Sequence, residues 1–109
     1  MRILSAGDLT EKVRRLCLRA CCDLPQDVLN ALSSARAAEA PESAAHSVLS
    51  QLIENQELAR SCRRPICQDT GVAVVFADLS EQLHIEGSLE QAVNEGVRLA
   101  YTKGYLRKS

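Results

Sequence analysis

Apolar residues recur at intervals of three or four along the first half of the chain, with charged or small polar residues between them. This spacing is typical of amphipathic helices, which bury one stripe and expose the remaining positions. The stripes are Val13, Leu16, Cys17, Ala20, Cys21 and Leu24; Val28, Leu29, Leu32 and Ala35; and Ala45, Val48, Leu49, Leu52 and Ile53. The pattern predicts an N-terminal layer of about three helices over residues 8–61.

Residues that favour helix ends stand beside each stripe. Asp8 and Glu11 are predicted to cap the first helix as a reciprocal pair. Pro25 suits the first turn of the second helix, and Ser43 is predicted to cap the third. Pro65 lacks a backbone donor and disfavours helix in the residue before it, so the third helix should end upstream.

The pattern changes after residue 61. Residues 72–76 are apolar without polar alternation, which predicts a strand buried on both faces. Residues 83–85 read as a short partner strand. Ser88 and Gln91 then form a capping box for a fourth helix, for which Gly104 is the predicted C-cap. The predicted fold class is α+β, with the helical layer first, short strands after the loop that contains Cys67, and one more helix.

The composition excludes several classes of partner. Hydrophobic residues make up 46% and charged residues 25% of the 109 positions, which is ordinary for a globular chain, and the net charge is −1. Aromatic residues are few and no basic field is present, so nucleic-acid binding is not expected. Charged residues interrupt the N-terminus and no apolar stretch is long enough for a membrane span, so we expect neither a signal peptide nor membrane insertion.

The cysteine count indicates a reducing compartment. Five cysteines are an odd number, and two of them are adjacent, so they make a poor disulfide framework. We therefore expect a cytoplasmic protein. They are Cys17, Cys21, Cys22, Cys62 and Cys67.

The most informative stretch is the predicted turn at residues 63–71. It places the thiol of Cys67, the amide of Gln68 and the carboxylate of Asp69 side by side between a helix and a strand. Loops held by regular elements on both sides often carry binding and catalytic residues. The turn is therefore the candidate site.

Two known motifs overlap in this turn. Asp69 begins an Asp-Thr-Gly tripeptide of the kind that aspartic proteases use. That mechanism needs an apolar strand leading into the aspartate and a sheet-built cleft where two carboxylates meet. Here a basic stretch and a long helical half precede Asp69, so the protease interpretation is rejected.

The longer string Pro-Ile-Cys-Gln-Asp-Thr-Gly at residues 65–71 resembles the cluster-binding loop of class I, iron–sulfur-dependent fumarate hydratases and the related L-tartrate dehydratases. A second stretch also resembles this family. It runs from Ala-Val-Asn-Glu-Gly-Val-Arg at residues 92–98 to Gly-Tyr-Leu-Arg-Lys-Ser at residues 104–109. With the helical lead-in, the resemblance covers nearly the whole chain.

The resemblance also concerns the extent of the domain. In this family the polypeptide continues well beyond the position of Ser109, and two short strands do not make a self-sufficient sheet. We therefore expect residues 1–109 to be a single, incomplete α-type domain, the N-terminal portion of an α subunit. Its helical part would cover about residues 8–61, and its loop–strand–helix part about residues 62–109.

The resemblance implies that Cys67 binds one iron of a [4Fe–4S] cluster. Three cysteines hold such a cluster and leave the fourth iron open to substrate, where it can act as a Lewis acid. The other two ligands do not follow from this sequence and are expected beyond its end, so the isolated chain should be inactive. The alternative for Cys67 is a small buried core residue.

The resemblance further implies that Gln68 and Asp69 face the substrate, Gln68 by hydrogen bonding to a carboxylate and Asp69 also in acid–base chemistry. The alternative for Asp69 is an Asx-turn that only shapes the loop. Arg107 resembles the family's clamp for a dicarboxylate, because a guanidinium fork matches carboxylate oxygens. Its alternative is an exposed terminal charge.

The implied activity is a hydro-lyase reaction: reversible hydration of fumarate to malate, as in the tricarboxylic acid cycle, or dehydration of tartrate. The implied partners are a small dicarboxylate, the rest of the α domain and a β subunit or domain, within an oligomeric enzyme. One alternative is a helical interaction module with a structural zinc bound by Cys62, Cys67 and His46 or His84. Another is a thiol redox switch at Cys67, which would need a nearby positive charge such as that of Arg64.

Overall fold

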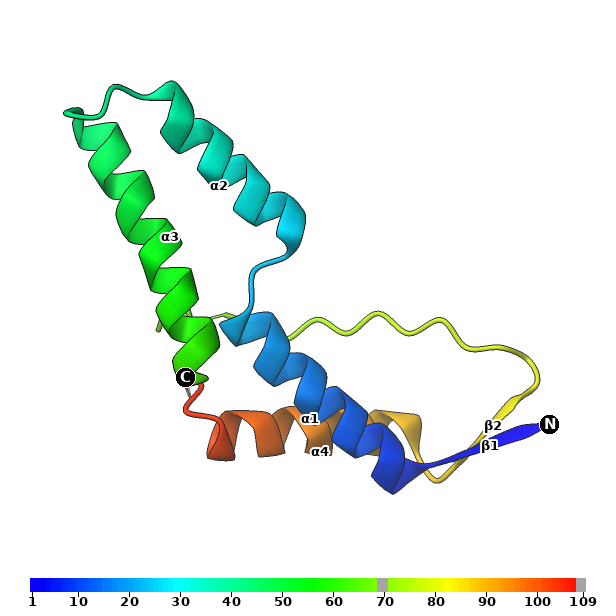
Figure 1. Ribbon diagram of the computed structural model, residues 1–109. Helices are drawn as coiled ribbons and strands as arrows, with labels where there is room; N and C mark the ends of the chain where they lie inside the picture. The colour runs from blue at the N-terminus through cyan, green and yellow to red at the C-terminus, as the bar shows by residue number, and fades with distance from the viewer. Residues whose placement is uncertain (69–70, 108–109) are drawn as a thin grey trace. The chain divides into compact units, whose positions relative to one another are not determined.

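The computed structural model of the protein describes residues 1–68 and 71–107 and has the predicted α+β architecture (Figure 1). The helices and strands follow one another in the order β1, α1, α2, α3, β2 and α4. Their bounds are Arg2–Ser5, Ala6–Cys22, Gln26–Ala38, Ala44–Cys62, Leu83–Glu86 and Leu89–Lys103.

The chain divides into two compact units. The terminal unit consists of Met1–Arg19 with Gln68–Ser109, and the hairpin unit consists of Ala20–Cys67. The terminal unit therefore contains the strands, most of α1 and all of α4. The hairpin unit contains the last turn of α1 together with α2 and α3.

The sheet of the terminal unit differs from the predicted one. Leu83–Glu86 forms β2 as expected, but its partner is the N-terminal strand β1, in parallel register from Arg2 opposite Leu83 to Ser5 opposite Glu86. The predicted strand at residues 72–76 is wrong, because that segment has no regular secondary structure and is exposed throughout. Val72 is 86% and Phe76 93% exposed. An apolar run becomes a strand only where another strand offers its backbone groups.

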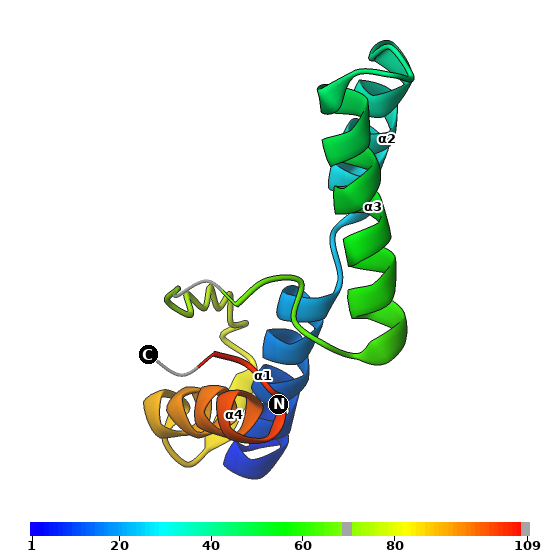
Figure 2. The same cartoon turned by 90° about the vertical axis from the view of Figure 1, so that its left-hand side faces the viewer.

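Helices α1 and α4 lie side by side in the terminal unit (Figures 1 and 2). Their contact is close at Gly96, where an added Cβ would lie 2.7 Å from the Thr10 carbonyl oxygen and 2.7 Å from Val13 Cβ. The Thr10 hydroxyl donates a hydrogen bond to the Ala92 carbonyl at 3.1 Å. The buried apolar side chains of this unit are Val13, Ala92, Ala100 and Leu106.

Helices α2 and α3 form an antiparallel hairpin in the second unit (Figure 2). The predicted stripes exist, but this unit covers them only in part. Helix α2 has no fully buried residue, and on α3 Val48 and Leu52 are 54% and 45% exposed. The buried side chains of the unit are Cys22, Gln56 and Ala59.

The helix ends confirm most of the predicted caps. The Ser43 and Ser88 hydroxyls accept hydrogen bonds from the backbone N–H groups of His46 and Gln91. Gly104 is the C-cap of α4 as predicted, whereas Pro25 is the N-cap of α2, one position before the first turn in which it was expected.

The cap predicted for the first helix is wrong. Helix α1 begins before Asp8, whose N–H donates to the Ser5 hydroxyl at 3.1 Å. Glu11 pairs instead with Arg14 and Arg15. The β1 strand leads directly into α1, so the cap falls on the last strand residue rather than on the first acidic one.

No helix in the described part of the chain is both long and apolar enough to cross a bilayer.

Candidate functional site

The candidate site begins where α3 ends. Arg63 adopts a left-handed conformation, with φ 51° and ψ 50°, and the N–H groups of Arg63 and Arg64 both donate to the Ala59 carbonyl. A left-handed residue after the last helical turn, with N–H groups bonded back to a carbonyl of that turn, is a common way for a helix to end. Pro65 follows at once and prevents the helix from continuing. The chain therefore leaves α3 in a defined direction toward Cys67.

Ile66, directly before Cys67, is bound on both sides of its backbone within the hairpin unit. Its N–H donates to the Cys21 carbonyl at 2.8 Å, and its carbonyl accepts from Asn55 Nδ2 at 2.8 Å. Cys21 lies in the last turn of α1, where carbonyls lack partners inside the helix. The backbone entering the predicted site is thus fixed by α1 and by a side chain of α3.

Cys67 itself is exposed and carries a free thiol. The structure therefore does not place it among core residues, which was the alternative interpretation. Cys62 is also exposed, whereas Cys22 is buried. Burial raises the pKa of the Cys22 and Cys17 thiols, so both remain protonated at neutral pH. These two cysteines are suited to the core rather than to metal binding or nucleophilic chemistry.

Gln68 and Arg107 are brought together in the terminal unit although 39 positions separate them. The Arg107 Nη1 atom donates a hydrogen bond to the Gln68 carbonyl oxygen at 2.6 Å. Leu106, the residue before Arg107, is buried and anchors the segment after α4. Two of the predicted site residues are thus adjacent. Asp69, the predicted catalytic residue, lies outside the described residues.

Asp23, near the start of the hairpin unit, forms ion pairs with two arginines near its end. Its carboxylate lies 3.2 Å from Arg63 Nη1 and 3.7 Å from Arg60 Nε, and its side chain is 24% exposed. Sequence reasoning missed both Asp23 and Asn55. Asparagine is a poor residue for a helix interior, so its place in the middle of α3 was the available signal.

The zinc alternative is not supported by the described residues. Within residues 1–68 and 71–107, no three His, Cys, Asp or Glu side chains are grouped closely enough to hold a metal ion. His46 and Cys62 lie at opposite ends of α3, sixteen positions apart, which corresponds to roughly 24 Å along a helix axis. They cannot bind the same ion.

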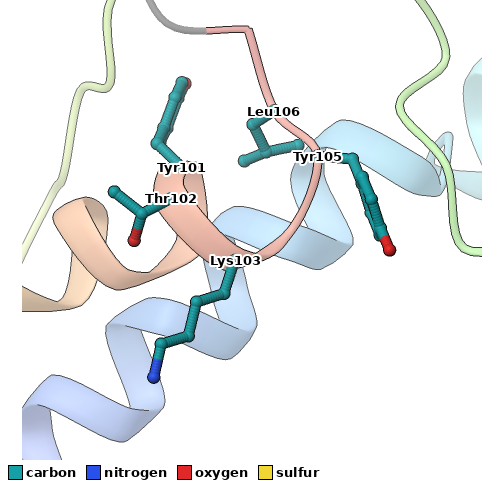
Figure 3. A pocket seen from close by; sticks show the side chains of 5 residues that line it. All are labelled: Tyr101, Thr102, Lys103, Tyr105 and Leu106. Carbon is teal, nitrogen blue, oxygen red and sulfur yellow. The ribbon is translucent and has the colours of Figure 1, made fainter.

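An open hollow of about 510 Å³ lies at the C-terminal end of α4 (Figure 3). Tyr101, Thr102, Lys103, Tyr105 and Leu106 line it. Figure 3 shows that Tyr101 and Lys103 point in opposite directions, so their polar groups do not converge on one ligand position. The hollow does not constitute a second site.

Fold and site together define a small α+β chain that has an exposed thiol on an anchored backbone in the hairpin unit and an arginine–carbonyl contact in the terminal unit. The model of the fumarate hydratase (fumerase) family matches residues 10–109, and the chain belongs to this family. No solved structure matches the chain.

Two curated relatives are α subunits of tartrate dehydratases. A candidate L(+)-tartrate dehydratase subunit alpha of Methanocaldococcus jannaschii is 33% identical over 101 residues, which is 91% of this chain and 35% of the relative. The L(+)-tartrate dehydratase subunit alpha of Escherichia coli strain K12 is 28% identical over 103 residues, which is 94% of this chain and 34% of the relative. The chain thus spans about a third of the length of these relatives.

Proposed function

We propose that the chain forms the N-terminal part of an α subunit or α-type domain of a hydro-lyase. The reaction would be the reversible hydration of fumarate to malate or the corresponding dehydration of tartrate. The observation that carries the proposal is the 2.6 Å hydrogen bond from Arg107 to the Gln68 carbonyl. It joins the two regions of sequence that resemble the family, and it does so at residues expected to bind a dicarboxylate.

The cofactor of the proposed enzyme is a [4Fe–4S] cluster, with Cys67 as one of its three cysteine ligands. An exposed thiol on an anchored backbone suits a single ligand position, and the described residues contain no group that could supply the whole set. We place the other two ligands outside these 109 residues. When bound, the cluster would supply a Lewis acid for the hydroxyl and a carboxylate of the substrate.

The side chains of the site would divide the remaining work. Arg107 gives one donor to the Gln68 carbonyl, and a guanidinium has five, so further donors can pair with a substrate carboxylate. The Gln68 amide would bind the same end of the dicarboxylate. Asp69 would exchange the proton at the carbon next to the carboxylate, which requires a carboxylate within hydrogen-bond reach of that carbon.

The proposed assembly extends beyond the chain. Residues 1–109 would be one incomplete domain that is completed by the rest of the α polypeptide and by a β subunit or domain, in an oligomeric enzyme. The isolated chain would then be inactive, since it offers one of three cluster ligands. A cytoplasmic location agrees with the five free cysteines.

Substitution of Arg107 in the complete enzyme tests the substrate role. Arg107→Lys keeps the charge but loses the fork, and a charge-assisted hydrogen bond contributes about 1.5–3 kcal/mol, so KM for the dicarboxylate should rise about 10- to 100-fold. Arg98→Lys is the matched control, because Arg98 is an exposed arginine of α4 that pairs with Glu95. Fumarate consumption, followed by its ultraviolet absorbance, measures both. An Arg107→Lys enzyme with the native KM would refute the substrate role.

Substitution of Cys67 tests the cofactor role in the same enzyme. Cys67→Ser should remove the iron–sulfur absorption and the activity together, whereas Cys62→Ser should keep both. A Cys67→Ser enzyme that retained a four-iron spectrum would exclude Cys67 as a ligand. So would a stable four-iron cluster reconstituted in the isolated chain from iron and sulfide, because that chain would then hold every ligand.

A further inference from the structure

The backbone next to Cys67 is held by a side chain that no part of the proposed mechanism uses. Asn55 Nδ2 donates to the Ile66 carbonyl at 2.8 Å, across eleven positions of sequence. The backbone N–H of the same residue, Ile66, donates a hydrogen bond to the Cys21 carbonyl at 2.8 Å. Both polar backbone groups of Ile66 are therefore bound, and the rotation of the chain at the next residue starts from a fixed peptide plane.

The position of Asn55 is unfavourable for its helix, which points to a role outside it. Asparagine lowers helix stability relative to alanine, because its side chain competes for backbone groups. Asn55 lies two turns before the end of α3, far from either cap position, where asparagine is favoured. Its side chain is directed to the loop rather than to its own helix.

Other contacts fix the backbone between the end of α3 and Cys67. The left-handed turn at Arg63 and the ion pair of Arg63 with Asp23 define where the chain leaves α3. The hydrogen bond from Asn55 then fixes Ile66, three residues after Arg63. Between them stands Pro65, whose ring restricts φ. Asn55 is the contact nearest to Cys67 in this series.

We propose that Asn55 is a positioning residue, which holds the Cys67 thiol in place through the Ile66 carbonyl. The loop would then already hold Cys67 in the conformation in which it binds the iron of the cluster. What Cys67 binds rests on the proposed function, but the positioning does not. The chemistry required of residue 55 is a side-chain amide donor, which asparagine and glutamine have and which aspartate and alanine lack.

The test is a set of variants in the 109-residue chain, read by amide hydrogen exchange with NMR. Asn55→Ala and Asn55→Asp should each make the Ile66 amide exchange about 3- to 10-fold faster, because losing the bond to the Ile66 carbonyl lets the segment open more often and so exposes the Ile66 N–H that the Cys21 carbonyl otherwise holds. Asn55→Gln should restore slow exchange, because it keeps the donor. Gln51→Ala, one turn earlier on the exposed face of α3, is the matched control and should leave Ile66 exchange unchanged.

Thermal unfolding separates positioning from a general structural role. Alanine is the better helix former, so Asn55→Ala should keep or raise the unfolding temperature while the loop exchanges faster. Faster exchange along the whole of α3 in Asn55→Ala would reject positioning. Native Ile66 exchange in both Asn55→Ala and Asn55→Asp would reject it equally.

The Cys67 experiment distinguishes this inference from the proposed function. A clear Asn55 effect together with a dispensable Cys67 leaves the positioning intact and rejects the cluster role. An absent Asn55 effect together with an essential Cys67 rejects the positioning and leaves the cluster role intact.

Discussion

Gly96 determines how closely α1 and α4 approach each other in the terminal unit. A Cβ at this position would meet a backbone oxygen, that of Thr10, as well as the side chain of Val13, which is itself buried. A backbone oxygen within a helix cannot move aside as a flexible side chain can. The absence of a side chain is therefore part of the packing, and the helical pattern alone did not indicate it.

Substitution of Gly96 should destabilise the protein despite a better helix propensity. Gly96→Ala gains up to about 1 kcal/mol of propensity but inserts a methyl group at 2.7 Å from two atoms. Overpacking of this kind costs about 1–3 kcal/mol, so we expect a net loss of stability in urea unfolding.

Gly7 provides the control for this prediction. It lies in α1, and the nearest atom to an added Cβ is Ser5 Oγ at 4.0 Å. Gly7→Ala should therefore stabilise the protein by about 0.5–1 kcal/mol. If Gly96→Ala were as stabilising as Gly7→Ala, the close contact of α1 and α4 would be wrong.

At the scale of single residues, the motif predicted Cys67, Gln68, Asp69 and Arg107, and the structure shows a hydrogen bond from Arg107 to the Gln68 carbonyl. The roles assigned to these residues stay predictions. Asn55 and Asp23 were not predicted, because each acts through a contact distant in sequence. A side chain's partner on another element leaves no periodic pattern in the sequence.

Among the elements, α1 is the one whose surface charges are most strongly coupled. Hydrogen bonds from Arg14, and then from Arg15, lower the pKa of Glu11 to about 2 from its ordinary value of 4.5. The bond from Arg98 likewise lowers the pKa of Glu95 on α4. Both are pairs at helical spacing, so they stabilise their own helices.

The stability of α1 should therefore fall at acidic pH. A carboxylate whose pKa is depressed by folding contributes its full stabilisation above the unfolded-state pKa and loses it as the pH falls through the folded-state pKa. For Glu11 this window lies between 4.5 and about 2. Glu11→Gln should lower the thermal unfolding midpoint at neutral pH and make its decline across that window shallower, as followed by circular dichroism.

The companion change is Arg14→Gln, which removes the main hydrogen-bond donor and should give the same shallower decline. The effect should be modest and should weaken with added salt, because the pair is exposed. Unfolding curves of Glu11→Gln and the native chain that ran parallel across the window would contradict the assignment.

The two predicted strands show why elements differ in predictability. Residues 72–76 are the more apolar and β-branched of the two segments, yet only residues 83–85 lie in a strand. The partner of that strand, β1, lies some eighty positions away in the sequence. Helices satisfy their own backbone groups, so their bounds followed from the sequence almost everywhere.

For the molecule as a whole, the exposed apolar segment at residues 72–79 has the largest consequence. Val72, Val74, Phe76 and Leu79 are between 45% and 93% exposed, and residues 72–77 contain neither charge nor proline. Short segments with these properties pair readily with other strands and promote aggregation.

Isolated chains should therefore associate in a concentration-dependent manner, and Phe76→Asp should suppress this association. The change places a charge in the middle of the segment at a side chain that is 93% exposed, so folding of either unit should be unaffected. Light scattering coupled to size-exclusion chromatography measures the association. A native chain that stayed monomeric at high concentration would contradict the prediction.

The control for this experiment is Ile3→Asp on β1, because Ile3 is 63% exposed and lies outside the segment. A drop in association with Phe76→Asp but not with Ile3→Asp would locate the effect in residues 72–79.

The sequence by itself determined the helices, most of their caps, the family and the loop that carries Cys67, because these depend on spacing and on local chemistry. Only the tertiary structure decided the partner of β2, the exposed state of residues 72–76, the contact of Arg107 with Gln68 and the hold of Asn55 on Ile66. The three contacts join backbone or polar groups that are separated along the chain, and residues 72–76 stay exposed because no strand lies beside them. Such groups are satisfied by whichever partner the fold brings near, and no local pattern records which one that is.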